Sequence, residues 1–136
     1  MAASKHLGIR DAVAALLAAL AGGRVRENDP KPLAGDLDNE ISVRRDRSTP
    51  TQATTGFPID WVTELSIEMK ARTEADADDL ACSVFAAVMA NQQLGGLSEY
   101  IEPGEMEWDQ AQGEKPLHRV TWRINVTHTT QNNVIT

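Results

Sequence analysis

The side chains best suited to acid–base or metal chemistry are three histidines, which the sequence separates widely. His6 lies near the amino terminus, whereas His118 and His128 share one predicted strand near the carboxyl terminus. Ten residues of strand place the latter two roughly 33 Å apart, so they cannot form one site alone. The sequence contains no Gly-x-Ser-x-Gly motif to supply a nucleophile. We therefore expect strand-end or surface histidines and no catalytic residue.

Other reactive residues also have simpler structural explanations. The aspartates within residues 76–79 lack the loop glycine and distal glutamate of an EF-hand, and they complement the dipole of a helix that begins there. Cys82 is the only cysteine and has no histidine beside it, which favours packing over catalysis. The Gly-Gly pairs at 22–23 and 95–96 lack the lysine and spacing of a phosphate loop. The sequence predicts no metal and no cofactor.

One local basic cluster, Arg44, Arg45 and Arg47, stands out in an acidic chain. Arginine forks suit carboxylates of a neighbouring subunit as well as phosphate, although solvation at the end of a strand would also explain them. The cluster has potential partners in a carboxylate-rich segment of the same chain, which contains Glu99, Glu102, Glu105, Glu107 and Asp109. A head-to-tail ring could therefore pair the basic rim of one subunit with the acidic edge of the next.

Composition favours one acidic domain. The chain has 136 residues, a net charge of −7 and a hydrophobic fraction of 41%. Residues 1–47 hold eight Lys/Arg against seven Asp/Glu, whereas residues 60–136 hold five against thirteen. This balance argues against nucleic acid as a free partner. A single cysteine indicates folding in a reducing compartment, and the short alanine-rich stretch at 12–21 predicts neither secretion nor a membrane span.

The first half of the chain predicts one helix followed by three strands. Ser4 is a favoured N-cap, and the Gly-Gly pair at 22–23 is expected to end the helix. A short strand starts at Val25, a second covers 40–46, and a third, half-buried strand covers 61–72. The helix should bury one stripe, formed by Ile9, Val13, Leu16, Leu17 and Leu20.

The second half predicts a helix and two more strands. Thr73 begins a capping box, and the apolar stripe that follows it is expected to end at the glycines 95–96. One strand lies at 105–109 with Met106 and Trp108 inward. The other covers 117–130, after a hairpin loop at 110–116. The order α-β-β-β-α-β-β predicts an α+β domain in which two helices cover one face of a mostly antiparallel, four- to five-stranded sheet. The other sheet face should be polar.

The connection between the second and third predicted strands is long and polar. Residues 47–60 are mostly Thr, Gln, Gly, Pro and Ala, too polar to pack and too long for a tight turn. We expect a mobile loop that orders against a partner, with Phe57 and Ile59 as apolar anchors. The tail at 131–136 is expected to behave likewise.

The whole pattern resembles the tail terminator (minor tail protein U-like) family of long-tailed bacteriophages. The resemblance rests on a first helix that ends in glycine, a strand with a polar loop, a second helix and a final strand. These segments read IRDAVAALLAALAGG, WVTELSIEMKAR, ADDLACSVFAAVMANQQLGG and HRVTWRINVTHTT. They span nearly the whole chain, which would form a single tail-terminator-like domain over residues 1–136.

The resemblance implies a structural protein of the virion tail, made in the bacterial host cytoplasm. Such proteins form a hexameric ring, which caps the tail tube, stops polymerisation of the tube protein and presents a surface to a head-completion or connector protein. DNA would only pass through the lumen, and a negative wall would let it slide. The expected lumen or subunit interface is the polar sheet face, with Glu64, Glu68, Thr121 and Asn125, although a solvated sheet face would show the same pattern. Arg123 lies on this face and is an expected interface residue.

Two other functions remain open at this stage. A neck or head-completion adaptor of the same virion would share ring assembly and differ in the end that docks. A small cytoplasmic enzyme or ligand-binding module would need a pocket with converging polar groups, and the sequence supplies no such set.

Overall fold

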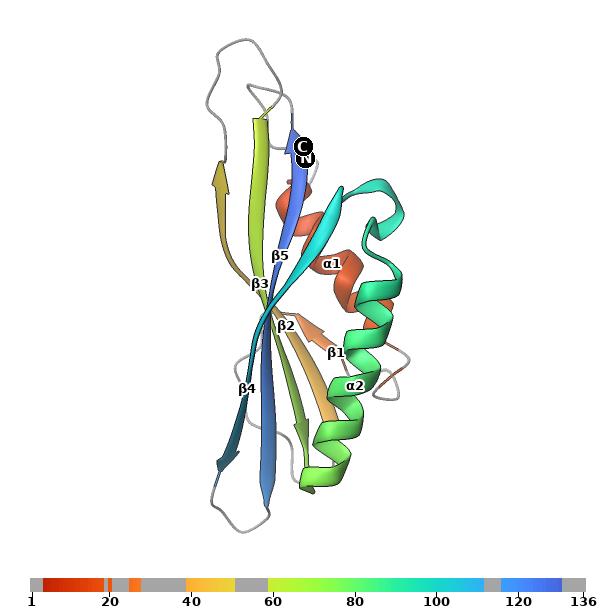
Figure 1. Ribbon diagram of the computed structural model, residues 1–136, viewed down its shortest axis with the longest axis vertical. Helices are drawn as coiled ribbons and strands as arrows, with labels where there is room; N and C mark the ends of the chain where they lie inside the picture. The colour runs from red at the N-terminus through yellow and green to blue at the C-terminus, as the bar shows by residue number, and fades with distance from the viewer. Residues whose placement is uncertain are drawn as a thin grey trace.

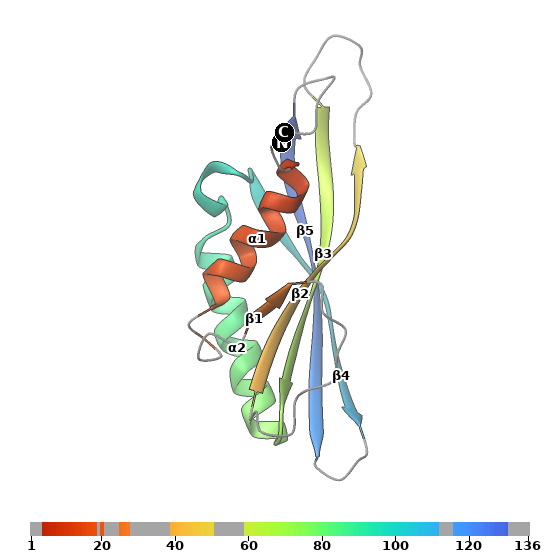
Figure 2. The same cartoon turned by 180° about the vertical axis from the view of Figure 1, so that it is seen from behind.

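In the computed structural model, two helices lie on one face of a five-stranded sheet (Figure 1, Figure 2). The structure describes residues 4–18, 20, 25–27, 39–50, 59–111 and 116–130. The elements are α1 (Lys5–Leu17), β1 (Val25–Glu27), β2 (Asn39–Pro50), β3 (Ile59–Ala71), α2 (Glu74–Ala90), the 3₁₀ turn η1 (Leu94–Gly96), β4 (Tyr100–Ala111) and β5 (Leu117–Thr130). The predicted order and α+β class are confirmed.

The sheet has the strand order β1-β2-β3-β5-β4, with β1 parallel to β2 and every other pair antiparallel. β1 pairs only with residues 41–43 of β2. Within the described part of the chain, residues 44–50 of β2 therefore pair on one side only, with β3, and β4 pairs only with β5. These two segments form opposite free edges of the sheet.

The apolar side chains of the sheet pack against the two helices. α1 lies over β1 and β2, and α2 lies over β3 and β5. Trp122 of β5 is 1% exposed, and its ring lies 5.2 Å from that of Phe85 on α2. Most of the predicted inward residues of β3, β5 and both helices form this core, which includes Ile9, Val13, Leu17, Leu65, Ile67, Met69, Val84, Val88, Val120, Ile124 and Val126.

Both predicted N-caps are confirmed, but both helices end earlier than expected. The hydroxyls of Ser4 and Thr73 accept hydrogen bonds from the amides of Leu7 and Asp76, at 3.2 and 3.1 Å. α1 ends at Leu17, before the glycines 22–23, which lie outside the described residues. α2 ends at Ala90, and the side chain of Asn91 donates to the Ala87 carbonyl at 2.8 Å. The glycines at 95–96 form a separate turn with φ of 67° and 99°.

Three strand predictions need correction. β2 continues to Pro50 and β3 begins at Ile59, so residues 47–50 and 59–60 belong to strands. Residues 51–58, with Phe57, lie outside the described residues. β4 extends well beyond the expected 105–109, and Trp108 is 59% exposed rather than buried. Its indole lies on the helix-covered face, but an edge strand has no further strand beside it to complete the packing.

The polar face of the sheet is less solvated than expected. Glu40 of β2 and Lys70 of β3 are 0% and 2% exposed, and Ser66 is buried as well. Glu40 and Lys70 are register partners, so opposite charges lie side by side on this face. Half-exposed Glu64 and Glu68 follow along β3.

Two glycine positions give opposite expectations for stability. A Cβ at Gly104 would lie 2.5 Å from the Arg123 carbonyl oxygen, whereas at Gly8 in α1 it would meet no atom within 4 Å. We expect Gly104→Ala to lower the free energy of unfolding by about 1–3 kcal/mol, because a strand must shift. Gly8→Ala should raise it by about 0.5–1 kcal/mol, because alanine favours helix. Urea unfolding measures both; an unchanged midpoint for Gly104→Ala would contradict the close approach.

Candidate functional site

A β-bulge divides the basic cluster between the two faces of the sheet. The register of β2 against β3 shifts between Arg45 and Arg47, leaving Asp46 as the extra residue. Arg45 is opposite Leu65, a core residue, and so lies on the helix-covered face. Arg44 and Arg47 lie on the other face. The three arginines expected to act as one rim therefore do not form one surface.

Arg44 and Arg47 already have carboxylates within their own chain. Arg44 donates to Asp46 at 2.9 Å, and Asp46 also accepts a hydrogen bond from the hydroxyl of Ser66. Arg47 pairs with Glu64 across the β2–β3 ladder, and this hydrogen bond raises the pKa of the guanidinium. These exposed pairs orient the arginines along the free edge of β2.

The opposite edge shows the same pairing with more carboxylates. Arg119 of β5 pairs with Asp109 of β4 and lies 4.0 Å from Glu68. The hydrogen bond from Arg119 holds the pKa of Asp109 below its usual range. Arg123 lies 3.4 Å from Glu107 and 3.9 Å from Glu105. Arg119 and Arg123 together thus lie within 4.0 Å of four carboxylates. Glu102 has no ion pair in the structure's described part.

The strand register places a basic residue of the β2 edge and an acidic residue of the β4 edge in the same row of paired residues across the sheet. Arg47 is opposite Glu64, Glu64 is opposite Asn125, and Asn125 is opposite Glu102. One row across the sheet therefore begins with a cation on the free edge of β2 and ends with an anion on the free edge of β4. Of the predicted anchors, Ile59 is half-exposed at the start of β3, opposite Thr130.

Two histidines meet in the structure, contrary to the expectation that the three are unrelated surface residues. The rings of His6 and His128 lie 4.7 Å apart, and both side chains are buried. Trp61 stacks edge-on against His6 at 4.9 Å. The inward phase of His128 was visible in the sequence, but the contact of the first turn of α1 with β3 and β5 was not. His118 is half-exposed at the other end of β5, as expected.

The hydroxyl of Thr63 links the two rings. It lies 3.2 Å from His6 Nδ1, 2.7 Å from His128 Nε2 and 2.7 Å from the hydroxyl of Ser48. Burial, together with the nearby charges of His6 and Lys5, lowers the pKa of His128 to about 4. Burial and Arg45 lower the pKa of His6. Both rings are therefore neutral near pH 7 and pack as polar groups between the start of α1 and the sheet.

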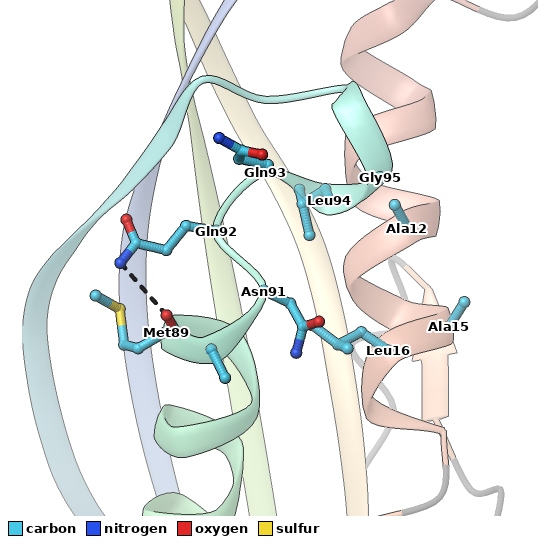
Figure 3. A pocket seen from close by; sticks show the side chains of 10 residues that line it. Ala12, Ala15, Leu16, Met89, Asn91, Gln92, Gln93, Leu94 and Gly95 are labelled. Carbon is cyan, nitrogen blue, oxygen red and sulfur yellow. Dashed lines mark hydrogen bonds between the residues drawn. The ribbon is translucent and has the colours of Figure 1, made fainter.

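A groove of about 680 Å³ lies between α1 and the end of α2 (Figure 3). Its walls are alanines, Leu16, Met89, Leu94 and amide side chains, with no ionisable residue among them. The amide of Gln92 already donates to the Met89 carbonyl at 3.3 Å. This lining offers neither an acid nor a base for catalysis.

Among the residues that the structure covers, no three side chains of His, Cys, Asp or Glu converge as metal ligands would. In the same portion of the chain, no helix combines the length and the apolar character needed to cross a bilayer.

No protein-family model and no curated protein matches this sequence. Among solved structures, the fold is similar to that of a chain in the virion of a native gene transfer agent particle. The TM-score is 0.60 at 15% sequence identity, and the match covers 93% of this chain and 92% of that chain. The two chains thus share a fold over almost their whole lengths.

The buried histidines predict a loss of stability in mild acid. The pKa of His128 is about 4 in the folded protein and about 6.5 when unfolded, so protons bind the unfolded chain preferentially as pH falls between these values. We expect the free energy of unfolding to drop by about 1.5 kcal/mol from pH 6.5 to 5. Urea unfolding at several pH values measures this dependence.

His118→Gln is the matched control, since His118 lies on the same strand and is half-exposed. It should leave the pH dependence unchanged, whereas His128→Gln should flatten it. An equal slope in both variants would show that the loss arises from carboxylates and not from His128.

Proposed function

We propose that this protein is a structural component of a phage-like virion. In this proposal it forms a ring that caps the tail tube, ends polymerisation of the tube protein and provides the surface to which the head is joined. The likeness to a chain of a gene transfer agent virion over nearly the full length of both chains supports a virion role. The sequence resemblance to tail terminators supports the more specific one.

The main support for the proposed ring is the charge pattern of the two free edges of the sheet. Arg47 and Glu102 end the same row of the sheet on opposite sides. A copy placed beside the first, at the same height, would bring its Arg47 to the Glu102 of its neighbour. Complementary edges of this kind favour a head-to-tail contact, which closes into a ring when the rotation per subunit allows it.

Strand directions also suit this contact. β2 is antiparallel to β3, β3 to β5, and β5 to β4, so the free edge of β2 runs antiparallel to that of β4. Copies related by rotation about an axis along the strands would therefore meet as an antiparallel pair. Such pairing satisfies the backbone groups that a free edge leaves open. We propose a hexameric ring on assembly.

The polar sheet face is the proposed wall of the lumen. It carries Glu64, Glu68, Thr121 and Asn125, and the carboxylates of β4 extend it toward the neighbour. Since Arg47 and Arg119 neutralise part of this charge, the wall is mildly rather than strongly acidic. DNA would pass such a surface without adhering. We propose no catalytic role for any residue.

A charge exchange between the two edges tests the ring. Arg47→Glu and Glu102→Arg each place like charges at every proposed contact, so each variant alone should lose at least ten-fold in assembly, because like charges oppose each other across the interface. An equimolar mixture restores opposite charges at both kinds of contact in an alternating ring. Sedimentation velocity of the two variants and of their mixture measures this.

Asp79→Arg is the control for Glu102→Arg, because it makes the same charge change on the exposed face of α2. It should assemble like the unmodified protein. Failure of the mixture to recover would argue against edge pairing, even if both variants fold normally by circular dichroism.

Capture on tail tubes separates the tail terminator from its closest rival. A terminator should bind one end of preformed tubes and prevent further addition of tube protein, and electron microscopy of tube lengths records both effects. A neck or head-completion adaptor would form a similar ring and leave tube growth unchanged. Protein that neither binds tubes nor limits their length would contradict the proposal.

A further inference from the structure

We propose that the end of β4 around Trp108 is a docking surface for an arginine- or lysine-bearing segment of another protein. The proposal goes beyond the ring and stands without it. In the proposed ring, a second copy would present Val25 of β1 in this row, whereas its Arg44 and Arg47 lie in other rows. Trp108 shares its row with Val120, Met69 and Ile41, and at Ile41 the sheet edge is β1.

An exposed aromatic side chain forms the centre of this surface. Trp108 is 59% exposed, the highest fraction among the exposed large hydrophobic side chains of the described residues. It lies on β4, whose outer side has no strand partner in the described chain. Large exposed aromatic rings on an unpaired edge are typical of interaction sites.

Two hollows flank the indole. One, of about 560 Å³, is lined by Trp108 with Glu74, Ala75 and Asp78 of α2. The other, of about 260 Å³, lies between Trp108, Glu74 and the strand residues Asp109 and Arg119. The small side chains of Ala75 and Ala77 leave the aromatic ring accessible from the helix side.

Charge decides the kind of occupant. Glu74 and Asp78 are exposed beside the indole, and Asp76 and Asp79 add to the negative charge of the same helix end. His118 and Arg119 line the smaller hollow, and Arg119 is paired with Asp109. An aromatic face between carboxylates attracts a guanidinium or ammonium group, which can stack on the ring while its charge is balanced. The same carboxylates repel phosphate, which excludes nucleic acid as the occupant.

Titration with a basic tripeptide tests the docking surface in the full-length protein. The probe is acetyl-Arg-Gly-Arg-amide at low salt, followed by ¹⁵N NMR of the three tryptophan indoles, with Trp108→Phe used for assignment. We expect a saturable shift of the Trp108 signal and none of the buried Trp122. Glu74→Gln combined with Asp78→Asn should weaken binding at least five-fold. Trp108→Ala should weaken it about two- to five-fold, followed at backbone amides of α2.

Glu102→Gln combined with Glu105→Gln is the matched control, because it removes the same amount of charge from the polar face of β4, on the other side of the sheet from α2. It should change affinity less than two-fold. An equal loss of affinity in both double variants would show that the peptide is attracted by the overall acidity of the protein, and would contradict a specific site at Trp108. So would equal binding of a glutamate tripeptide or of a short single-stranded DNA, or a Trp108-dependent self-association in sedimentation.

Discussion

The antiparallel ladder between β3 and β5 is the constraint on which the rest of the structure depends. It runs from Ile59 opposite Thr130 to Ala71 opposite His118 without a register shift. Because side chains alternate along a strand, this single register decides which residues face the helices and which face away. It places Leu65 beside Ile124 in the core and Glu64 beside Asn125 on the polar face. The outer strands β2 and β4 pair with β3 and β5, so this ladder also determines which of their residues share a row across the sheet.

The outer strands depart from this regularity, and each departure affects a charged edge. The bulge in β2 sends Arg45 toward α1 and leaves Arg44 and Arg47 on the polar face. The register shift in β4 lies between Pro103 and Met106, where the backbone of Gly104 approaches that of Arg123. Bulges twist and bend edge strands, and they also discourage indiscriminate edge-to-edge pairing. In the proposed ring, the bulges of β2 and β4 would allow pairing only between edges of matching shape, which adds specificity for a second copy.

The regular elements could be predicted from the sequence, and the contacts between them could not. Period-two alternation placed β5 correctly over its full length, and helical periodicity with Thr73 as N-cap placed α2. A bulge adds one residue without any mark in the sequence, so Arg44, Arg45 and Arg47 were expected on one rim. His6 and His128 are 122 positions apart, and only the packing of α1 on the sheet brings them together. Trp108 fitted the inward phase, but phase alone does not reveal that an edge strand has no further neighbour.

The intrachain ion pairs of the edge arginines are compatible with the proposed ring. Arg47 and its partner Glu64 lie on the surface, and exposed pairs of this kind contribute little to stability. Exchanging such a pair for an intersubunit one therefore costs little and gains little. Single contacts between copies would be weak, whereas a closed ring makes every subunit hold two neighbours at once. Assembly governed by many weak, complementary contacts discriminates by geometry, since only the correct rotation per subunit satisfies all of them together. Contacts of this strength would suit the proposed ring, which caps the tail tube.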